Sequence, residues 1–124
     1  MRAQAYIEHA MPTLEADFAE ADQVLKEGGQ ESTWLDAFYQ NAECRLLNLY
    51  DHARLIAWRI YDREEAATYW REQTEASEKI LQQLERSRAN AFKAGLPEIP
   101  SMISAIRTAA EIVQACRGSY ELFS

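Results

Sequence analysis

Apolar residues recur at intervals of three and four positions along almost the whole chain, a spacing that places them on one face of an α-helix. The first such stripe consists of Ile7, Met11, Leu14, Phe18, Ala21 and Leu25. Pro12 interrupts it, and because proline removes a backbone hydrogen bond, it either kinks a longer helix or sits in the first turn of a helix that begins near Met11. The apolar residues keep the same spacing on both sides of Pro12, which favours one longer, kinked helix. Gly28 and Gly29 end the segment.

A second stripe runs through residues 33–60 and predicts a helix of about 28 residues, or about 42 Å. Thr33 resembles an N-cap residue, since Asp36 follows three positions later. Asp62 and Glu65 have the spacing of a capping box, which predicts a break before the third helix. No Gly or Pro lies between Gln30 and Ala94, so one kinked helix remains an alternative. The stripe consists of Leu35, Tyr39, Ala42, Leu46, Leu49, Ala53, Ile56 and Ile60.

Two further helices follow. The third ends at Gly95-Leu96-Pro97, and the fourth begins at Pro100-Ser101, with Gly118 expected to end it. Their expected core positions are Ala66, Trp70, Ser77, Ile80, Leu81, Leu84 and Phe92, then Met102, Ile103, Ile106, Ala109, Ala110, Val113 and Cys116. We therefore predict an all-α fold, an antiparallel up-down four-helix bundle whose first helix is kinked or split at Pro12, as a single domain over residues 1–124.

The composition fits a globular protein, because 48% of the 124 residues are hydrophobic. No uncharged run is long enough for a membrane span, and Glu8 lies where a signal peptide needs apolar residues, so we expect a cytoplasmic protein. Cys44 and Cys116 have no CxxC partner and lie inside predicted helices. They are predicted to be free buried thiols rather than a disulfide or a metal site.

The formal net charge is -7, which argues against unspecific nucleic-acid binding, because that binding depends on Lys and Arg at the phosphates. Acidic residues are concentrated before residue 32. A solvated, solubilising face is the simple interpretation of this acidity. The functional alternative is a docking surface for a basic protein, as in acidic inhibitors, immunity proteins and antitoxins, formed by Glu15, Asp17, Glu20 and Asp22.

The second predicted helix has more apolar surface than one bundle seam needs. Beside its main stripe it carries Trp34, Leu47, Tyr50, Arg54, Trp58 and Tyr61. A helix that is apolar on two sides is covered on two sides, so it is either the central helix of the bundle or part of an interface. Tyr, Trp and Arg are enriched at interface centres, which favours a homodimer or partner surface. A small-molecule pocket between helices is a further alternative.

His9 is expected to be a surface residue beside Glu8, whereas His52 lies on one helix face with Arg45, Asn48 and Arg59. The segment Arg45-Leu46-Leu47-Asn48-Leu49-Tyr50-Asp51-His52 resembles the Arg-x(4-6)-His motif of HEPN domains, small, helical and usually dimeric modules that include metal-independent ribonucleases. The resemblance implies that His52 handles the proton of the attacking 2′-hydroxyl or the leaving oxygen, while Arg45 stabilises the phosphorane. It covers eight residues, and Leu46 stands where the family usually has a polar residue.

No motif in the chain is specific for one type of enzymatic reaction. There is no Glu-x-x-His pair for a di-iron site, no glycine-rich phosphate loop and no zinc-ligand spacing, so we expect no metal and no cofactor. The favoured function is a small acidic interaction protein that forms a homodimer and docks a basic protein. The alternative is a HEPN-like ribonuclease or nucleotide-binding module that uses Arg45 and His52.

Overall fold

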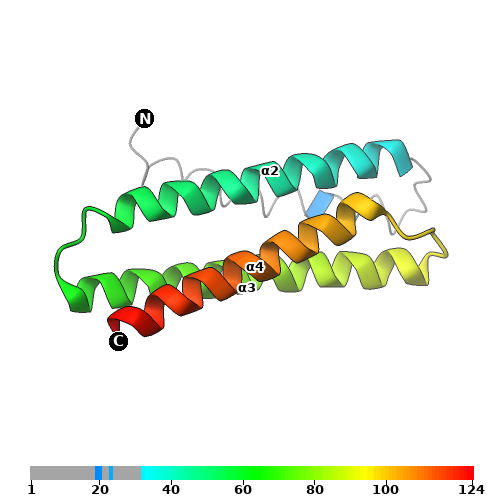
Figure 1. Cartoon of the computed structure of the whole chain (residues 1–124). Helices are drawn as coiled ribbons and strands as arrows, with labels where there is room; N and C mark the ends of the chain where they lie inside the picture. The colour runs from blue at the N-terminus through cyan, green and yellow to red at the C-terminus, as the bar shows by residue number, and fades with distance from the viewer. Residues whose placement is uncertain (1–18, 21–22, 24–31) are drawn as a thin grey trace.

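A computed structural model of the chain describes residues 19–20, 23 and 32–124. In the helix that begins at Ser32, the side chains are described from Leu35 onward. Among these residues, three long helices form an elongated antiparallel bundle: α2 (Ser32–Ala57), α3 (Arg63–Lys93) and α4 (Pro100–Phe123) (Figure 1). The described residues contain no strand, which confirms the all-α class. Pro12 and most of the predicted first helix lie outside the described residues. No described helix is both long and apolar enough to cross a membrane.

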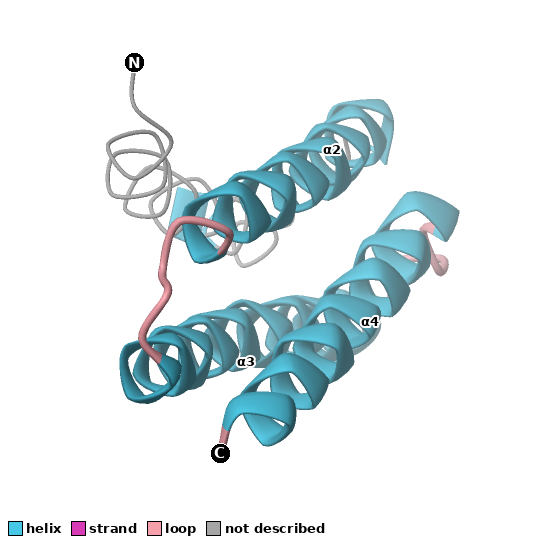
Figure 2. Cartoon of the chain, turned by 60° about the vertical axis from the view of Figure 1, so that its left-hand side comes forward, coloured by secondary structure: helices cyan, strands magenta, loops and turns pink. Residues whose placement is uncertain are grey.

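The core forms where α4 packs against both other helices, whereas α2 and α3 touch each other little. In Figure 2 the three helices occupy the corners of a triangle. Six members of the predicted stripe of α2 are buried: Leu35, Tyr39, Ala42, Leu46, Leu49 and Ala53. The predicted core residues Ala66, Trp70, Ser77, Ile80, Leu84, Met102, Ala109, Val113 and Cys116 are buried as well.

Phe92 departs from the predicted core, since its side chain is 84% exposed. The buried line of α3 runs through Leu84, Ser87 and Ala91, and a residue one position later is turned by about 100° away from that line. Leu81, Ile103, Ile106 and Ala110 are only half-buried. The sequence pattern also missed the buried Ser87, Ser101, Ala105, Thr108 and Ile112.

The break between α2 and α3 is confirmed. The carboxylate of Asp62 accepts a hydrogen bond from the backbone N–H of Glu65 at 2.9 Å, the contact expected of an N-cap. α2 begins at Ser32 and ends at Ala57, so Thr33 lies inside its first turn and the predicted end near Ile60 was wrong. Residues 58–60 instead form tighter turns, in which Ile60 N–H bonds to the carbonyl of Ala57 at 3.0 Å.

Gly118 does not end α4, which continues to Phe123. The guanidinium of Arg63, at the start of α3, donates to the carbonyl oxygens of Phe123 at 3.1 Å and Leu122 at 3.4 Å. A cation at these last carbonyls satisfies acceptors that have no partner inside the helix, and it also suits the helix dipole. The end of α4 is thereby fixed beside the start of α3 (Figure 1).

The turn between α3 and α4 follows its predicted signal. Gly95 has φ of +74°, a left-handed conformation that favours glycine. The N–H of Leu96 bonds to the carbonyl of Ala91 at 3.1 Å, and the N–H of Gly95 bonds to that of Phe92 at 3.0 Å. This pair of bonds is the Schellman motif that closes many helices.

Replacing Gly95 and replacing Gly118 by alanine are expected to change the free energy of unfolding in opposite directions. Gly95→Ala should lower the free energy of unfolding by about 1 kcal/mol, because a side chain disfavours the left-handed backbone. Gly118→Ala should raise it by about 0.5–1 kcal/mol, because glycine weakens a helix interior. A Cβ meets nothing within 4 Å at either position, so contacts do not obscure the comparison. Urea denaturation measures both, and the same sign for both variants would contradict this assignment.

Both cysteines are free, as predicted, but only Cys116 is buried. Cys44 is exposed because it lies two positions from both Ala42 and Leu46, which points it away from the buried face of α2. Burial raises the pKa of the Cys116 thiol to about 11, against a smaller lowering effect of a hydrogen bond with Ser77. The thiol is therefore protonated at neutral pH and is a core group rather than a nucleophile.

Candidate functional site

An aromatic cleft opens at the end of the bundle where α2 meets α3. α4 begins near the N-terminal half of α2 and finishes beside the first turn of α3, so it diverges from the C-terminal half of α2 (Figure 1). The cleft between them has a volume of about 300 Å³. It is lined by Arg54, Ala57, Trp58, Ile60, Trp70, Ser119 and Phe123.

Trp70, which lines the aromatic cleft, belongs to a cluster of packed rings. Trp70 is buried, and its ring centroid lies 5.7 Å from that of Tyr69 and 6.5 Å from that of Tyr50. The Arg54 guanidinium lies 5.9 Å from the centroid of Tyr50, within cation–π range. Burial raises the pKa of Tyr50, so its hydroxyl stays neutral. Tyr50 and Tyr69 do not line the cleft themselves, but they pack against the Trp70 ring that does.

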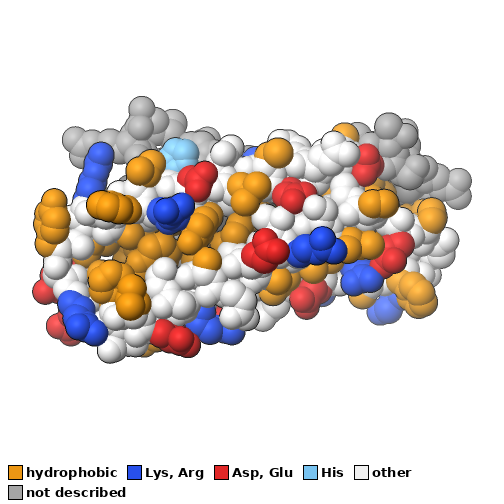
Figure 3. Space-filling model, viewed as in Figure 1, with side chains coloured by type: hydrophobic (Ala, Val, Ile, Leu, Met, Phe, Trp, Pro, Cys, Tyr) orange, Lys and Arg blue, Asp and Glu red, His pale blue; other side chains and the backbone are white. Residues whose placement is uncertain are grey.

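The surface around the cleft is unusually apolar. Trp58 is 79% exposed, Tyr61 95%, Leu122 72% and Leu55 57%. These four residues, here called the aromatic end, come from the last turns of α2 and α4 and from the connection to α3. Figure 3 shows apolar side chains at this end of the molecule, and they continue along the seam between α2 and α4 to the opposite end. Large exposed apolar side chains grouped together mark interaction sites more often than isolated ones do.

The structure brings together part of the predicted α2 surface. Arg54 and Trp58 line the cleft, Tyr50 lies below Arg54, and Tyr61 is exposed nearby. Leu47 is 47% exposed but lies further along α2 and does not line the cleft. Trp34 belongs to α2, but its side chain lies outside the described part of the chain. Sequence reasoning missed Trp70, Ser119 and Phe123 as cleft residues, because their place depends on how α3 and α4 lie against α2.

Most of the residues expected to dock a basic protein are not among those that the structure describes. Glu15, Asp17 and Asp22 lie outside the described residues. Glu20 is described, and it is helical and exposed, as are Ala19 and Gln23.

Arg45 and His52 lie on α2 seven residues apart, or about 10 Å along the helix axis, and both are half-buried. The Nδ1 atom of His52 lies 2.7 Å from the carbonyl oxygen of Asn48. A carbonyl only accepts, so Nδ1 carries the proton and donates it. Arg59 does not extend this face, because α2 ends before it. The predicted cationic strip is therefore shorter than the sequence indicated.

A polar contact between α2 and α4 was also missed. The half-buried carboxylate of Glu43 accepts hydrogen bonds from Thr108 Oγ1 at 2.7 Å and Ser104 Oγ at 3.0 Å. A glutamate on a helix normally indicates a solvated face, so sequence alone gave no signal for this pairing. The contact joins α4 to the N-terminal half of α2, and the two helices separate into the cleft beyond it.

The side chains that line the cleft are mostly apolar. Its lining offers one charged group, the Arg54 guanidinium, and one side-chain hydroxyl, that of Ser119. In the described part of the chain, no three His, Cys, Asp or Glu side chains are grouped so as to hold a metal ion. No family model matches the chain, and no curated protein or solved structure is similar enough to match it.

Proposed function

We propose that the chain is a small interaction protein that self-associates through the aromatic end. The observation that carries this proposal is the exposure of Trp58 and Tyr61 beside a preformed apolar cleft. Two aromatic side chains this exposed present about 350 Å² of apolar surface, a large share of the roughly 800 Å² per partner in a stable interface. Trp, Tyr and Arg are also the residue types that dominate binding energy.

The contacts that hold the cleft together support the same proposal. Trp70 packs against Tyr50 beneath the cleft, and Arg63 bonds to the last carbonyl groups of α4. A surface that is ordered before binding loses less conformational entropy when a partner docks. In this proposal the protein binds, and it performs no chemical step.

A second surface completes the proposed role. The acidic residues Glu15, Asp17, Glu20 and Asp22 are proposed to dock a basic protein partner, because opposite potentials speed encounter and select the partner. The support is the clustering of acids in the sequence and the exposure of Glu20.

We also propose that the segment over residues 7–25 is the fourth helix of the bundle. Three described residues within it, Ala19, Glu20 and Gln23, are helical and exposed. At 100° per residue they lie opposite the stripe that contains Phe18 and Leu25. That stripe needs a surface to pack against, and the sparse contact between α2 and α3 leaves room for a helix beside them. Circular dichroism checks this, since α2, α3 and α4 are about two-thirds of the chain and a fourth helix makes it about four-fifths.

The test of self-association is sedimentation velocity over a range of protein concentrations. The wild-type protein should sediment faster as its concentration rises. Trp58→Ala should weaken association by about 30-fold or more, the effect of removing a central interface aromatic. Leu47→Ala is the matched control, because it removes an exposed apolar side chain of α2 that does not line the cleft. A wild-type protein that stays monomeric would refute the proposal.

The ribonuclease alternative depends on different residues. It requires His52 as the base, and the bond from Nδ1–H to Asn48 is the arrangement that leaves Nε2 unprotonated in the neutral ring. RNA cleavage by the purified protein that is lost in His52→Ala would favour this alternative over a purely binding role.

A further inference from the structure

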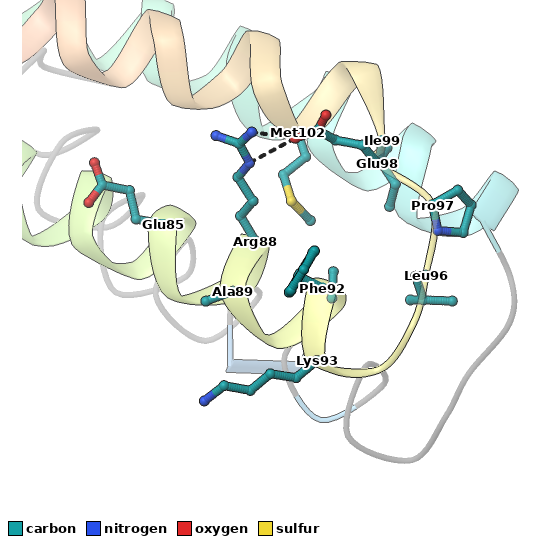
Figure 4. Close-up of a pocket in the computed structure, with 11 residues that line it drawn as sticks. Glu85, Arg88, Ala89, Phe92, Lys93, Leu96, Pro97, Glu98, Ile99 and Met102 are labelled. Carbon is teal, nitrogen blue, oxygen red and sulfur yellow. Dashed lines mark hydrogen bonds and ion pairs between the residues drawn. The ribbon is translucent and has the colours of Figure 1, made fainter.

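A second apolar surface lies at the opposite end of the bundle, at the turn between α3 and α4. It is a hollow of about 710 Å³, within the size range of binding pockets. Its floor is formed by the buried Ala91, Ile99 and Met102, and the exposed ring of Phe92 forms one wall. Figure 4 shows Phe92 and Met102 facing each other, with Leu96 and Pro97 on the turn beyond them. We call this surface the apolar hollow.

The shape of the apolar hollow is fixed by the backbone. The left-handed Gly95 and the bond from Leu96 N–H to Ala91 hold Leu96 beside the last turn of α3. The guanidinium of Arg88 forms an ion pair with Glu98, with Nε 3.0 Å from Oε1, which ties α3 to the segment before α4 (Figure 4). Arg88 and Glu98 neutralise each other in this pair, so neither charge needs a partner from a molecule in the hollow. An apolar group therefore suits the hollow best.

The two ends of the bundle carry different apolar surfaces. One end carries the protruding Trp58 and Tyr61, and the other carries the apolar hollow. α3 runs between them over 31 residues, about 46 Å, so the two surfaces cannot meet within one molecule. They can meet between two copies of the chain.

We infer that Trp58 of one copy inserts into the apolar hollow of the next, so that the chains associate head to tail. This inference rests on the proposed self-association and names the surface that the aromatic end contacts. Each copy then uses each surface once, and a contact of this kind extends into an open chain unless its rotation closes a ring.

Charge favours this arrangement over a symmetric pairing of two aromatic ends. Trp58 lies between Arg54 and Arg59, and both are exposed. In a two-fold contact centred on Trp58 the same surface patch meets its own copy, which brings the guanidinium groups that flank Trp58 near one another. The rim of the hollow instead carries two acidic and two basic side chains, Glu85, Glu98, Arg88 and Lys93. Because these charges balance, the rim has no net charge to repel Arg54 and Arg59.

The experiment separates the two surfaces by mutation and then mixes the variants. Trp58→Ala leaves a chain with an intact hollow and no inserting side chain. Ala89→Arg places a charged side chain at the rim of the hollow, from an exposed position of α3, and leaves the aromatic end intact. Gln82→Arg is the matched control, because it adds the same charge two turns earlier on α3 at an exposed position that does not line the hollow. Thermal denaturation confirms that each variant folds.

Sedimentation velocity then gives a clear pattern if the inference holds. The wild type and Gln82→Arg should form species larger than dimers as concentration rises. Trp58→Ala and Ala89→Arg should each associate at least about 30-fold more weakly alone, and an equimolar mixture should form a dimer that does not grow further. The mixture dimerises because it holds one intact copy of each surface.

Two results would overturn the inference. If Ala89→Arg associates as strongly as the wild type while Trp58→Ala does not, the aromatic ends pair with each other; the proposed self-association then stands and the head-to-tail contact fails. If the two variants do not complement each other when mixed, the hollow is not the surface that receives Trp58. A monomeric wild type would refute both proposals together.

Discussion

Replacing Trp70 with alanine should lower the free energy of unfolding by about 3–5 kcal/mol, the usual cost of removing a buried large aromatic. Trp70 is only 4% exposed, and it contacts the rings of Tyr50 and Tyr69. The loss combines apolar area that becomes unburied with a cavity that its neighbours cannot fill. Urea denaturation followed by circular dichroism measures the change.

The matched comparison is Trp58→Ala, which removes the same side chain from a site that is 79% exposed. Its effect on the unfolding free energy of the monomer should stay within about 0.5 kcal/mol, as is usual for surface positions. Trp58 is therefore expected to matter for association and Trp70 for folding. Equal destabilisation by the two variants would show that the floor of the cleft and its rim have been assigned to the wrong residues.

Local signals in the sequence predicted the helix ends that depend on a few neighbouring residues. Asp62 and Glu65 form the predicted cap of α3, and Gly95 takes the left-handed conformation expected of it. Each is decided by a backbone hydrogen bond within one turn. The predicted helix end at Gly118 was wrong, because α4 continues to Phe123 and its end is held by Arg63, which is far away in the sequence.

The buried stripes were predictable because helical periodicity alone determines which residues share a face. Phe92 was placed in the core because it is apolar, although it lies one position, or about 100°, beyond the buried line through Leu84 and Ala91. Ser87 and Thr108 were missed for a related reason. Small polar side chains fit where helices approach closely, and a pattern of apolar residues does not mark those places.

The candidate site was predicted only in part, from the surplus of apolar residues on α2. Arg54 and Trp58 were identified because they lie outside the main stripe. Their partners in the cleft, Trp70 and Phe123, come from two other helices. The hydrogen bonds of Glu43 with Ser104 and Thr108 join α4 to α2, and no spacing along the chain indicates how these two helices cross.

Raising the pH above about 9 should destabilise the fold through two groups at its centre. Burial raises the pKa of Cys116 from 9.0 to about 11. The pKa of Tyr69 is raised from 10.0 to about 12, first by burial and then by the charges of Cys116 and Glu72. In the unfolded chain both groups lose their protons near the ordinary values, while the folded chain retains them. The unfolded state then binds fewer protons, so stability falls as the pH rises.

The expected loss through Cys116 is about 1 kcal/mol per pH unit between pH 9 and pH 11, and the effect of Tyr69 begins about one unit higher. Urea denaturation at a series of pH values measures this slope. Cys116→Ala should flatten the slope between pH 9 and 10, and Tyr69→Phe should flatten it above pH 10. Cys44→Ala is the matched control, because it removes the exposed thiol. An unchanged slope in Cys116→Ala would mean that the buried thiol does not couple folding to alkaline pH.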